Sequence, residues 1–196
     1  MQAEVIAASG VWMSGVPLTV LVTTFNEAAN IDACLESVAW AADRLVVDSG
    51  STDGTTARAT ALGARVVTHP YESAARQKNW ALALVQFPWV LILDADERVT
   101  PPLAAAIRAT VLANGPHDGY FLRRQSFFMG HPIRHCGWDR DRVLRLFRTG
   151  RGHYDDRRVH ELLQLDGTTA ELAPPLLHYT YRSFHDYLDK LGRYTE

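Results

Sequence analysis

The chain has few cysteines and no long apolar run, and both absences narrow its class. Only Cys34 and Cys136 occur among 196 residues, which is too few for a disulfide framework and favours a reducing compartment such as the cytoplasm. No run approaches the ~18 apolar residues that a membrane-spanning helix needs. The first fifteen residues lack a basic flank and an unbroken apolar stretch, so we do not expect a signal peptide.

A strong net charge is also missing, but the basic residues are unevenly placed. The formal net charge is −2, which argues against a nucleic-acid-binding protein. Ten of the twenty basic residues are arginines between Arg123 and Arg158. Only four acids share this window: Asp139, Asp141, Asp155 and Asp156. The local charge is therefore about +6, which predicts contact with an anionic membrane surface unless the arginines pair with those aspartates.

Short apolar segments alternate with amphipathic ones over the first half of the chain. The pattern predicts strands at 18–23, 44–48, 65–68 and 89–93. It predicts helices capped by Asn30, over 55–62, and from a Ser73 cap to about Gln86 with Trp80, Leu84 and Phe87 facing inward. Strands alternating with helices form a parallel, twisted α/β sheet covered on both faces, and ligands bind beyond the carboxyl ends of its strands.

The alternation stops after a helix predicted over 101–114. One more strand, GYFLRRQSFF, is followed by a region rich in Gly, His, Arg and Trp that contains the short apolar segment RVLRLF. This pattern predicts a smaller, irregular antiparallel addition that completes a pocket. No linker separates the halves, so we expect one domain over 1–196, with a ligand-binding half at 18–100 and the addition at 101–196. A helix capped by Ser183 has no clear stop signal, and we expect the natural chain to continue beyond it.

Three carboxylates, Asp94, Asp96 and Glu97, follow the fourth predicted strand directly. Residues two apart on an extended segment lie on the same side, about 6.6 Å apart, so Asp94 and Asp96 can reach into one space. Like charges raise each other's cost of ionising, which indicates that a cation sits among them. Mg²⁺ or Mn²⁺ suits one or two carboxylates completed by water and phosphate oxygens. The plain structural alternative is that Asp94 caps a turn and the other two are solvated.

Other readings of these motifs fit less well. A dehalogenase-type phosphohydrolase also has D-x-D after an apolar strand, but it expects Thr or Val where Arg98 stands, and its motif normally follows the first strand. DSGSTDG has its glycine displaced from the position that a calcium loop requires, and Ala59 stands where that loop needs Glu. His131, His135 and Cys136 form one local cluster without a second pair, which is a weak zinc signal.

The order of the motifs resembles family 2 glycosyltransferases of the GT-A fold. TTFNEAANI, VVDSGSTDGT, ARQKNWAL and WVLILDADE follow the order of that family's nucleotide-binding segments over about residues 18–100. The later HCGWDRDRVLRLFR, RVHE and LLHYTYRSFHDYLDKLGRYT are similar to bacterial lipopolysaccharide inner-core glucosyltransferases. The resemblance implies a GT-A, Rossmann-like, mostly parallel twisted sheet with an acceptor-side addition.

The resemblance also implies roles for individual residues. It places the base and ribose against the end of the first strand, the uracil edge against Asp48, and a phosphate near the helix before the fourth strand. The nucleotide-binding residues it implies are Thr23, Phe25, Asn26, Glu27, Asp48, Asp53, Lys78, Asn79, Asp94 and Ala95. It implies Asp96, Asp94 and a late histidine, His178, as ligands of Mg²⁺ or Mn²⁺. Structural roles remain open, such as an exposed helical Lys78 or a purely structural His178.

The catalytic base is the least determined part of the resemblance. Family 2 enzymes commonly carry a Glu-Asp pair in the acceptor region, and this chain has no such dipeptide. Glu161 in RVHE is the first candidate and Asp141 in WDRD is the second, because neighbouring arginines should lower the pKa of Asp141. We therefore expect an inverting, metal-dependent transfer of glucose from UDP-glucose to an anionic, lipid-linked saccharide of the lipopolysaccharide core, at the cytoplasmic face of the inner membrane. A phosphohydrolase and a non-catalytic nucleotide-sugar-binding module are the alternatives.

Overall fold

The computed structural model describes residues 15–135, 137–138, 141–155, 162–181, 183–184 and 187–188. The helices are α1 Ile31–Ser37, α2 Thr55–Ala61, α3 Ala74–Leu82 and α4 Pro101–Leu112. The strands are β1 Val16–Thr24, β2 Ala41–Asp48, β3 Arg65–Thr68, β4 Trp89–Asp94, β5 Glu97–Val99, β6 Gly119–Phe128, β7 His131–Pro132, β8 Arg142–Arg148, β9 Gly152–Tyr154, β10 Leu163–Leu165 and β11 Thr169–Tyr181.

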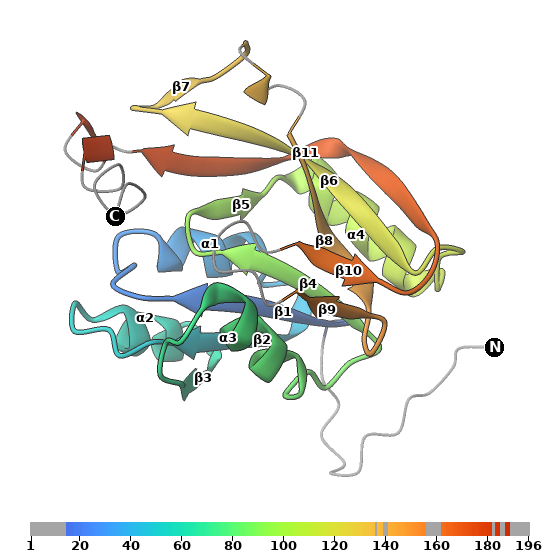
Figure 1. The fold of residues 1–196 in the computed structure, drawn as a ribbon, viewed down its shortest axis with the longest axis horizontal. Helices are drawn as coiled ribbons and strands as arrows, with labels where there is room; N and C mark the ends of the chain where they lie inside the picture. Colours follow the sequence, from blue (N-terminus) through green and yellow to red (C-terminus); the bar gives the residue numbers. More distant parts are fainter. Residues whose placement is uncertain are drawn as a thin grey trace.

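One large sheet organises the molecule (Figure 1). Its strand order is β3-β2-β1-β4-β8-β6-β11-β5, with β7 paired to β6. The four predicted strands form the parallel part, since β1 pairs in parallel with both β2 and β4, and β2 with β3. β8 then joins antiparallel to both β4 and β6. The predicted α/β class, with the GT-A arrangement of strands implied by the resemblance, is confirmed.

The second half of the chain differs in detail from the predicted antiparallel addition. β9 and β10 do form a separate two-stranded antiparallel sheet. β11, however, runs parallel to β6 and antiparallel to β5, so the addition continues the main sheet rather than standing beside it. Its register shifts between Leu172 and Leu176, where Pro174 and Pro175 lack the N–H that a ladder needs. The sequence pattern did not predict β11, because its two prolines interrupt the strand signal.

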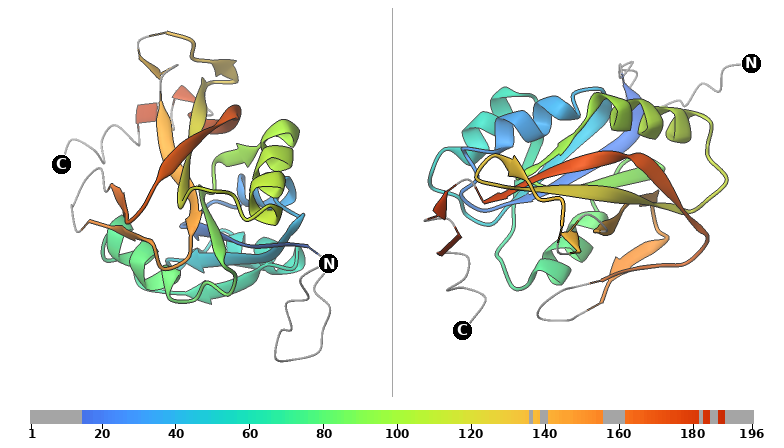
Figure 2. Two further views of the ribbon diagram at one scale, coloured as in Figure 1. Left: turned by 90° about the vertical axis from the view of Figure 1, so that its right-hand side faces the viewer. Right: turned by 90° about the horizontal axis from the view of Figure 1, so that it is seen from above.

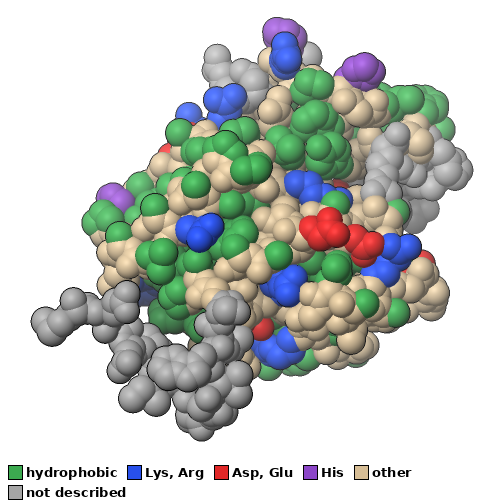
Figure 3. All heavy atoms as spheres, turned by 180° about the vertical axis from the view of Figure 1, so that it is seen from behind, with side chains coloured by type: hydrophobic (Ala, Val, Ile, Leu, Met, Phe, Trp, Pro, Cys, Tyr) green, Lys and Arg blue, Asp and Glu red, His purple; other side chains and the backbone are tan. Residues whose placement is uncertain are grey.

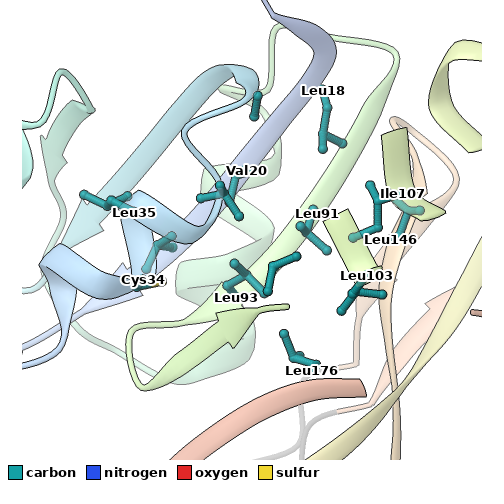
Figure 4. Close-up of a cluster of buried hydrophobic side chains, with 14 of the residues drawn as sticks. Leu18, Val20, Cys34, Leu35, Leu91, Leu93, Leu103, Ile107, Leu146 and Leu176 are labelled. Carbon is teal, nitrogen blue, oxygen red and sulfur yellow. The ribbon is translucent and has the colours of Figure 1, made fainter. Parts of the chain in front are cut away.

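Apolar residues of β1 and β4 are buried on both faces, which explains their unbroken apolar sequences. On one face, the core joins these strands to α1, α2 and α4 (Figure 4); Val20 and Leu91 of the strands lie with Leu35 and Leu103 of the helices. On the opposite face, Leu21 and Ile92 lie in a second cluster with residues of α3 and β9. The two helical layers are visible on either side of the sheet (Figure 2). Truncating one such leucine to alanine typically costs about 2–5 kcal/mol.

Two of the predicted helix details are wrong. α3 begins at its predicted cap, where the Ser73 hydroxyl accepts from the Arg76 N–H at 3.2 Å, but it ends at Leu82 rather than near Gln86. The chain then tightens into turns with bonds three residues back, because Pro88 disfavours helix before it. Trp80 does not face inward: it is 38% exposed and packs on His69 with 4.1 Å between ring centroids.

Asn30 stands at the predicted start of α1 but makes no capping hydrogen bond with its side chain. Its amide donates instead to Glu27 Oε2 at 2.7 Å, because Glu27 lies within reach on the preceding loop. Thr100 does cap α4, accepting from the Leu103 N–H at 3.3 Å. Within the described part of the chain, no helix has the length and apolar character that crossing a bilayer requires.

Candidate functional site

The carboxyl ends of three parallel strands meet at one edge of the sheet. Thr23 of β1 pairs in register with Asp94 of β4, and Thr24 pairs with Asp48 of β2. Polar segments of the sequence begin at these strand ends, at 23–27, 48–53 and 94–97. The fold therefore brings the TTFNE, DSGSTD and DADE segments together, as the parallel topology requires.

The loop after β1 is fastened to the loop after β2 by reciprocal hydrogen bonds. The backbone N–H of Asn26 donates to Ser51 Oγ at 2.8 Å, and the N–H of Thr52 donates to Asn26 Oδ1 at 2.9 Å. Asn26 has a φ of 54°, a left-handed conformation that asparagine tolerates better than most residues. Phe25, next to it, is 56% exposed. The two loops form one rim from which Phe25 projects.

Asp53 and Glu27 strengthen the same rim. Asp53 accepts from the N–H of Ala28 at 2.9 Å and from the N–H of Thr55 at 3.1 Å, at the first turn of α2. A hydrogen bond from the Thr55 hydroxyl is the largest influence on the carboxyl group and lowers the pKa of Asp53. The N–H of Glu27 donates to that hydroxyl at 2.9 Å. Both acids thus stabilise the loops that the resemblance assigns to nucleotide binding.

Asp48 is 1% exposed and serves the loop that follows it. Its Oδ2 accepts from the N–H groups of Gly50 and Ser51 at 2.9 and 2.8 Å. Its Oδ1 accepts from the hydroxyls of Thr24 and Ser51 at 3.1 and 2.5 Å. Four donors from the protein therefore surround this carboxylate, and its contact with a uracil edge stays a prediction.

Helix α3 directs Lys78 toward the strand ends. Lys78 is 7% exposed, which excludes the expectation of an exposed helical lysine. Its Nζ lies 3.9 Å from Asp94 Oδ1 and 5.1 Å from the centroid of the Tyr154 ring. The Asn79 amide donates to the Tyr154 carbonyl at 2.9 Å and accepts from the Tyr154 N–H at 2.8 Å. Lys78 thus belongs to the charged cluster, whereas Asn79 fixes β9.

Arg145 is the cation that lies among the clustered carboxylates. Its Nη2 donates to Asp94 Oδ2 and, at 2.9 Å, to Glu97 Oε1. The other oxygen of Glu97 accepts from the Asp94 N–H at 2.9 Å. Burial alone would raise the pKa of Asp94, but Arg145 and then Lys78 hold it well below its usual range. Burial raises the pKa of Glu97, which is 0% exposed, although Arg145 opposes that rise.

A β-bulge presents Arg145 to these acids. Tyr120 and Phe121 are consecutive on β6, yet they pair with Leu146 and Leu144 of β8, so Arg145 is the extra residue. Bulges bend a strand locally and redirect a side chain, and they are common beside functional sites. In the sequence, Arg145 is only one of several arginines near Asp141. The signal available was a single arginine inside the apolar segment VLRLF, where a buried charge requires partners.

Asp96 and His178 form the other side of the cluster. His178 Nε2 lies 3.5 Å from Asp96 Oδ2, and its Nδ1 lies 3.1 Å from Ser126 Oγ. β11 brings His178 there, because it pairs with Glu97 in register and the Tyr179 N–H donates to the Asp96 carbonyl at 2.9 Å. The late histidine proposed from the sequence therefore lies beside the predicted metal-binding aspartate.

The donor set fits a divalent cation that relies partly on its substrate. Cis ligands of an octahedral ion with ~2.1 Å bonds lie about 3 Å apart, close to the separation between Asp96 and His178. Asp94 has a side chain 36% exposed, and one of its oxygens already binds Arg145. Among the residues that the structure describes, no three His, Cys, Asp or Glu side chains are grouped to hold an ion by themselves. Phosphate oxygens and water would have to supply the remaining ligands.

The turn between β4 and β5 carries Ala95, which is 4% exposed. Its carbonyl accepts from Arg98 Nη1 at 2.7 Å, and the same nitrogen donates to the Glu97 carbonyl at 2.7 Å. Arg98 Nη2 also donates to Asn30 Oδ1 at 3.1 Å. Arg98 therefore fastens the turn between β4 and β5 to the loop before α1, a role that the sequence did not reveal.

Of the two candidate bases, only Asp141 lies among the residues that the structure describes. Asp141 accepts from Arg124 Nε and lies against Arg124 Nη2, both at 2.7 Å, so it is an ion-pair partner as expected, although of an arginine on β6. Arg124 Nη1 also lies 3.6 Å from Glu97 Oε1, which links Asp141 to the charged cluster. Glu161 lies outside the described residues, as does Cys136 of the weak zinc cluster.

Comparison with known proteins gives consistent matches. A family model described as glycosyl transferase family 2 matches residues 19–162. The lipopolysaccharide core biosynthesis glycosyltransferase LpsC of Rhizobium meliloti is 30% identical over 186 residues, which span 91% of this chain and 69% of the relative. An uncharacterized glycosyltransferase of Rickettsia bellii is 35% identical over 58% of this chain and 39% of its own length.

Among solved structures, glucosyl-3-phosphoglycerate synthase from Mycobacterium tuberculosis, in complex with Mn²⁺, UDP and its product, is 27% identical. The match covers 59% of this chain and 45% of that one, with a TM-score of 0.46. The chain thus spans less than half the length of that structure and of the Rickettsia relative.

Proposed function

The chain belongs to glycosyl transferase family 2, and from this premise we propose that it is a metal-dependent, inverting transferase of glucose from UDP-glucose. The observation that carries the proposal is the meeting of three parallel strand ends, beside which His178 lies 3.5 Å from Asp96. The named role of the Rhizobium relative supports a saccharide of the lipopolysaccharide core as acceptor. Membership of this family leaves the phosphohydrolase alternative without support.

Each part of the site has a role in this proposal. Asp96 and His178 would hold Mg²⁺ or Mn²⁺, whose positive charge would offset the negative charge growing on the departing diphosphate. Lys78 adds a fixed positive charge next to Asp94. Asp94 faces the ribose with the oxygen that Arg145 does not bind. The rim of Phe25 and Asn26 receives the base.

The transfer also needs a group that accepts a proton. The acceptor hydroxyl oxygen bonds to the anomeric carbon, the bond from that carbon to the diphosphate oxygen breaks, and the hydroxyl proton passes to a carboxylate. That carboxylate must lie on the face opposite the leaving group, within ~2.6–3.2 Å of the hydroxyl. Asp141 Oδ2 contacts both Nε and Nη2 of Arg124, so this carboxylate is already engaged in an ion pair. We therefore keep Glu161 as the proposed base.

Calorimetry of nucleotide binding tests the metal assignment. Asp96→Ala should abolish the Mn²⁺-dependent part of UDP binding, because it removes the central ligand. Asp166→Ala is the matched control, since Asp166 is an exposed aspartate in the turn after β10. Undiminished Mn²⁺-dependent UDP binding in Asp96→Ala would contradict the assignment of Asp96 as a metal ligand.

A transfer assay tests the base and separates an enzyme from a binding module. Glu161→Gln should bind UDP-glucose normally but lose transfer by ~10²- to 10⁴-fold. If transfer persists in that variant and collapses in Asp141→Asn, the base is Asp141.

A thermal-shift screen of UDP, GDP and dTDP sugars with Mn²⁺ tests the identity of the donor. A shift with GDP sugars alone would contradict the proposal of UDP-glucose.

A further inference from the structure

The hairpin between β6 and β7 ends in an unusual turn. Phe128 pairs with His131, so Met129 and Gly130 form a two-residue loop. Both have positive φ, 49° and 81°, as in a type I′ turn. Asn, Asp or Gly normally occupies the first of these positions, because other side chains are strained there. Met129 is therefore an unfavourable residue for its own backbone.

Burial does not compensate for this strain, since Met129 is 48% exposed. β7 stands at the top of the molecule (Figures 1 and 2), and the turn before it lies next to the end of β11, with Met129 and Gly130 both exposed. The half-exposed Met129 side chain therefore gains only part of the stabilisation that full burial would give. Residues held in such conformations are frequent at sites of binding.

The tip is supported by ordered aromatic packing. The Met129 N–H donates to the Tyr181 carbonyl at 2.8 Å, which ties the turn to the end of β11. The ring centroids of Phe128 and Tyr181 lie 5.7 Å apart, and those of Tyr181 and Tyr187 lie 5.2 Å apart. Phe184, 6.0 Å from Tyr187 between centroids, is 57% exposed. Packed aromatic rings thus connect the turn to the exposed Phe184.

The hairpin is also basic, with no acid to offset it. Residues 123–138 contain Arg123, Arg124 and Arg134 and two histidines, but no Asp or Glu. Arg124 is committed to Asp141, whereas Arg123 and Arg134 are exposed. Histidine and basic side chains lie at the top of the molecule with hydrophobic side chains below them (Figure 3). Exposed apolar side chains beside unopposed positive charge match the headgroup region of an anionic bilayer.

The structure limits which arginines of the window 123–158 can contact a membrane. Arg142, Arg145 and Arg148 of that window form ion pairs with acids of the same chain, with Glu171, Asp94 and Asp118. These arginines are therefore not fully available to lipid. Within the described residues of the window, the hairpin is the part where exposed arginines and exposed apolar residues occur together.

We propose that the β6–β7 hairpin tip, led by Met129 and supported by Phe184, inserts into the interface of a bilayer with anionic headgroups. Met129 lies three residues beyond Ser126, which contacts His178, so about 10 Å of strand separates the membrane from the site. A lipid-linked acceptor could reach the site over that span. This role in bringing the acceptor to the site rests on the proposed function, but vesicle binding can be measured without any glycosyl transfer.

Flotation with vesicles of phosphatidylethanolamine and phosphatidylglycerol tests the proposal at low salt. Met129→Asn should weaken vesicle binding roughly tenfold, because it removes the inserted side chain. The same variant should melt ~2–4 °C higher, because asparagine relieves the turn. Loss of binding can then not be attributed to misfolding. Leu112→Asn is the matched control: Leu112 is 65% exposed at the end of α4, and its replacement should leave binding unchanged.

Three results would overturn the proposal. Wild-type protein that does not float, or that floats equally with pure phosphatidylcholine vesicles, would remove the anionic bilayer as partner. Equal binding of Met129→Asn and wild type would remove the tip as the contact. Sedimentation that shows a dimer in the wild type and a monomer in Met129→Asn, with equal flotation, would assign the tip to self-association. UDP binding should be the same in both proteins, so failure here leaves the proposed function intact.

Discussion

The two sides of the candidate site are held together by different interactions. On the loop side, residues 25–28 and 48–55, side chains accept from nearby backbone N–H groups and hydroxyls. On the ionic side, a chain of charges, buried at Lys78, Arg145 and Glu97, also includes Asp94 and Arg124. The loop side can rearrange at the cost of single hydrogen bonds, whereas the ionic side leaves a buried charge whenever one member is lost.

The largest expected effect is therefore on the ionic side. Arg145→Met should lower the free energy of unfolding by about 3–5 kcal/mol, because Glu97 and Asp94 lose their shared partner. Urea unfolding measures it. The matched control is Arg142→Met on the same strand, whose exposed pair with Glu171 at 3.2 Å should be worth less than ~1 kcal/mol.

A double variant provides a second test of whether ion pairing stabilises the ionic side. Adding Glu97→Gln to Arg145→Met should restore part of the lost stability, because the buried negative charge disappears with its partner. Equal losses in Arg145→Met and Arg142→Met, or no recovery in the double variant, would show that the cluster is not held by its ions.

The contrast also explains what the sequence could reveal. The loop side is made from residues that are adjacent within motifs, and the period of the apolar segments places those motifs at strand ends. Asp94 and Asp96 could be predicted as a site because they follow a buried strand. His178 could be proposed through the resemblance alone, since its position depends on β11, which the pattern did not show.

The ionic side depends on long-range pairing that local patterns do not encode. Arg145 contacts Asp94 although 51 positions separate them in the sequence, and the bulge that makes this contact possible is not predicted by any residue type. Periodicity reports which face a residue occupies but not which strand will lie beside it. The sequence therefore indicated that a cation belongs among the carboxylates, and it could not indicate that the protein supplies one itself.

A smaller effect is expected from the centre of the loop side. Asp48→Ala should lower the free energy of unfolding by about 1–3 kcal/mol, because it leaves the N–H groups of Gly50 and Ser51 without an acceptor. Hydrogen exchange at these amides should accelerate, while Asp166→Ala should leave it unchanged. If Asp48→Ala keeps wild-type stability yet loses UDP binding, Asp48 acts on the nucleotide rather than on its loop.

The smallest expected effect is the pH dependence of the loop side. The lowered pKa of Asp53 means that the folded state favours the ionised carboxylate, mainly through the Thr55 hydroxyl. Its contribution to stability is fully present above the unfolded pKa of about 4 and is lost as pH falls through the lower, folded pKa. Wild type should thus exceed Asp53→Asn in stability by less than ~1 kcal/mol near neutrality, since the group is exposed. Denaturation of both proteins at several pH values should show this difference constant from about pH 7 to 5 and shrinking below about pH 4; a difference that grows with acidity would contradict a charge-dependent cap.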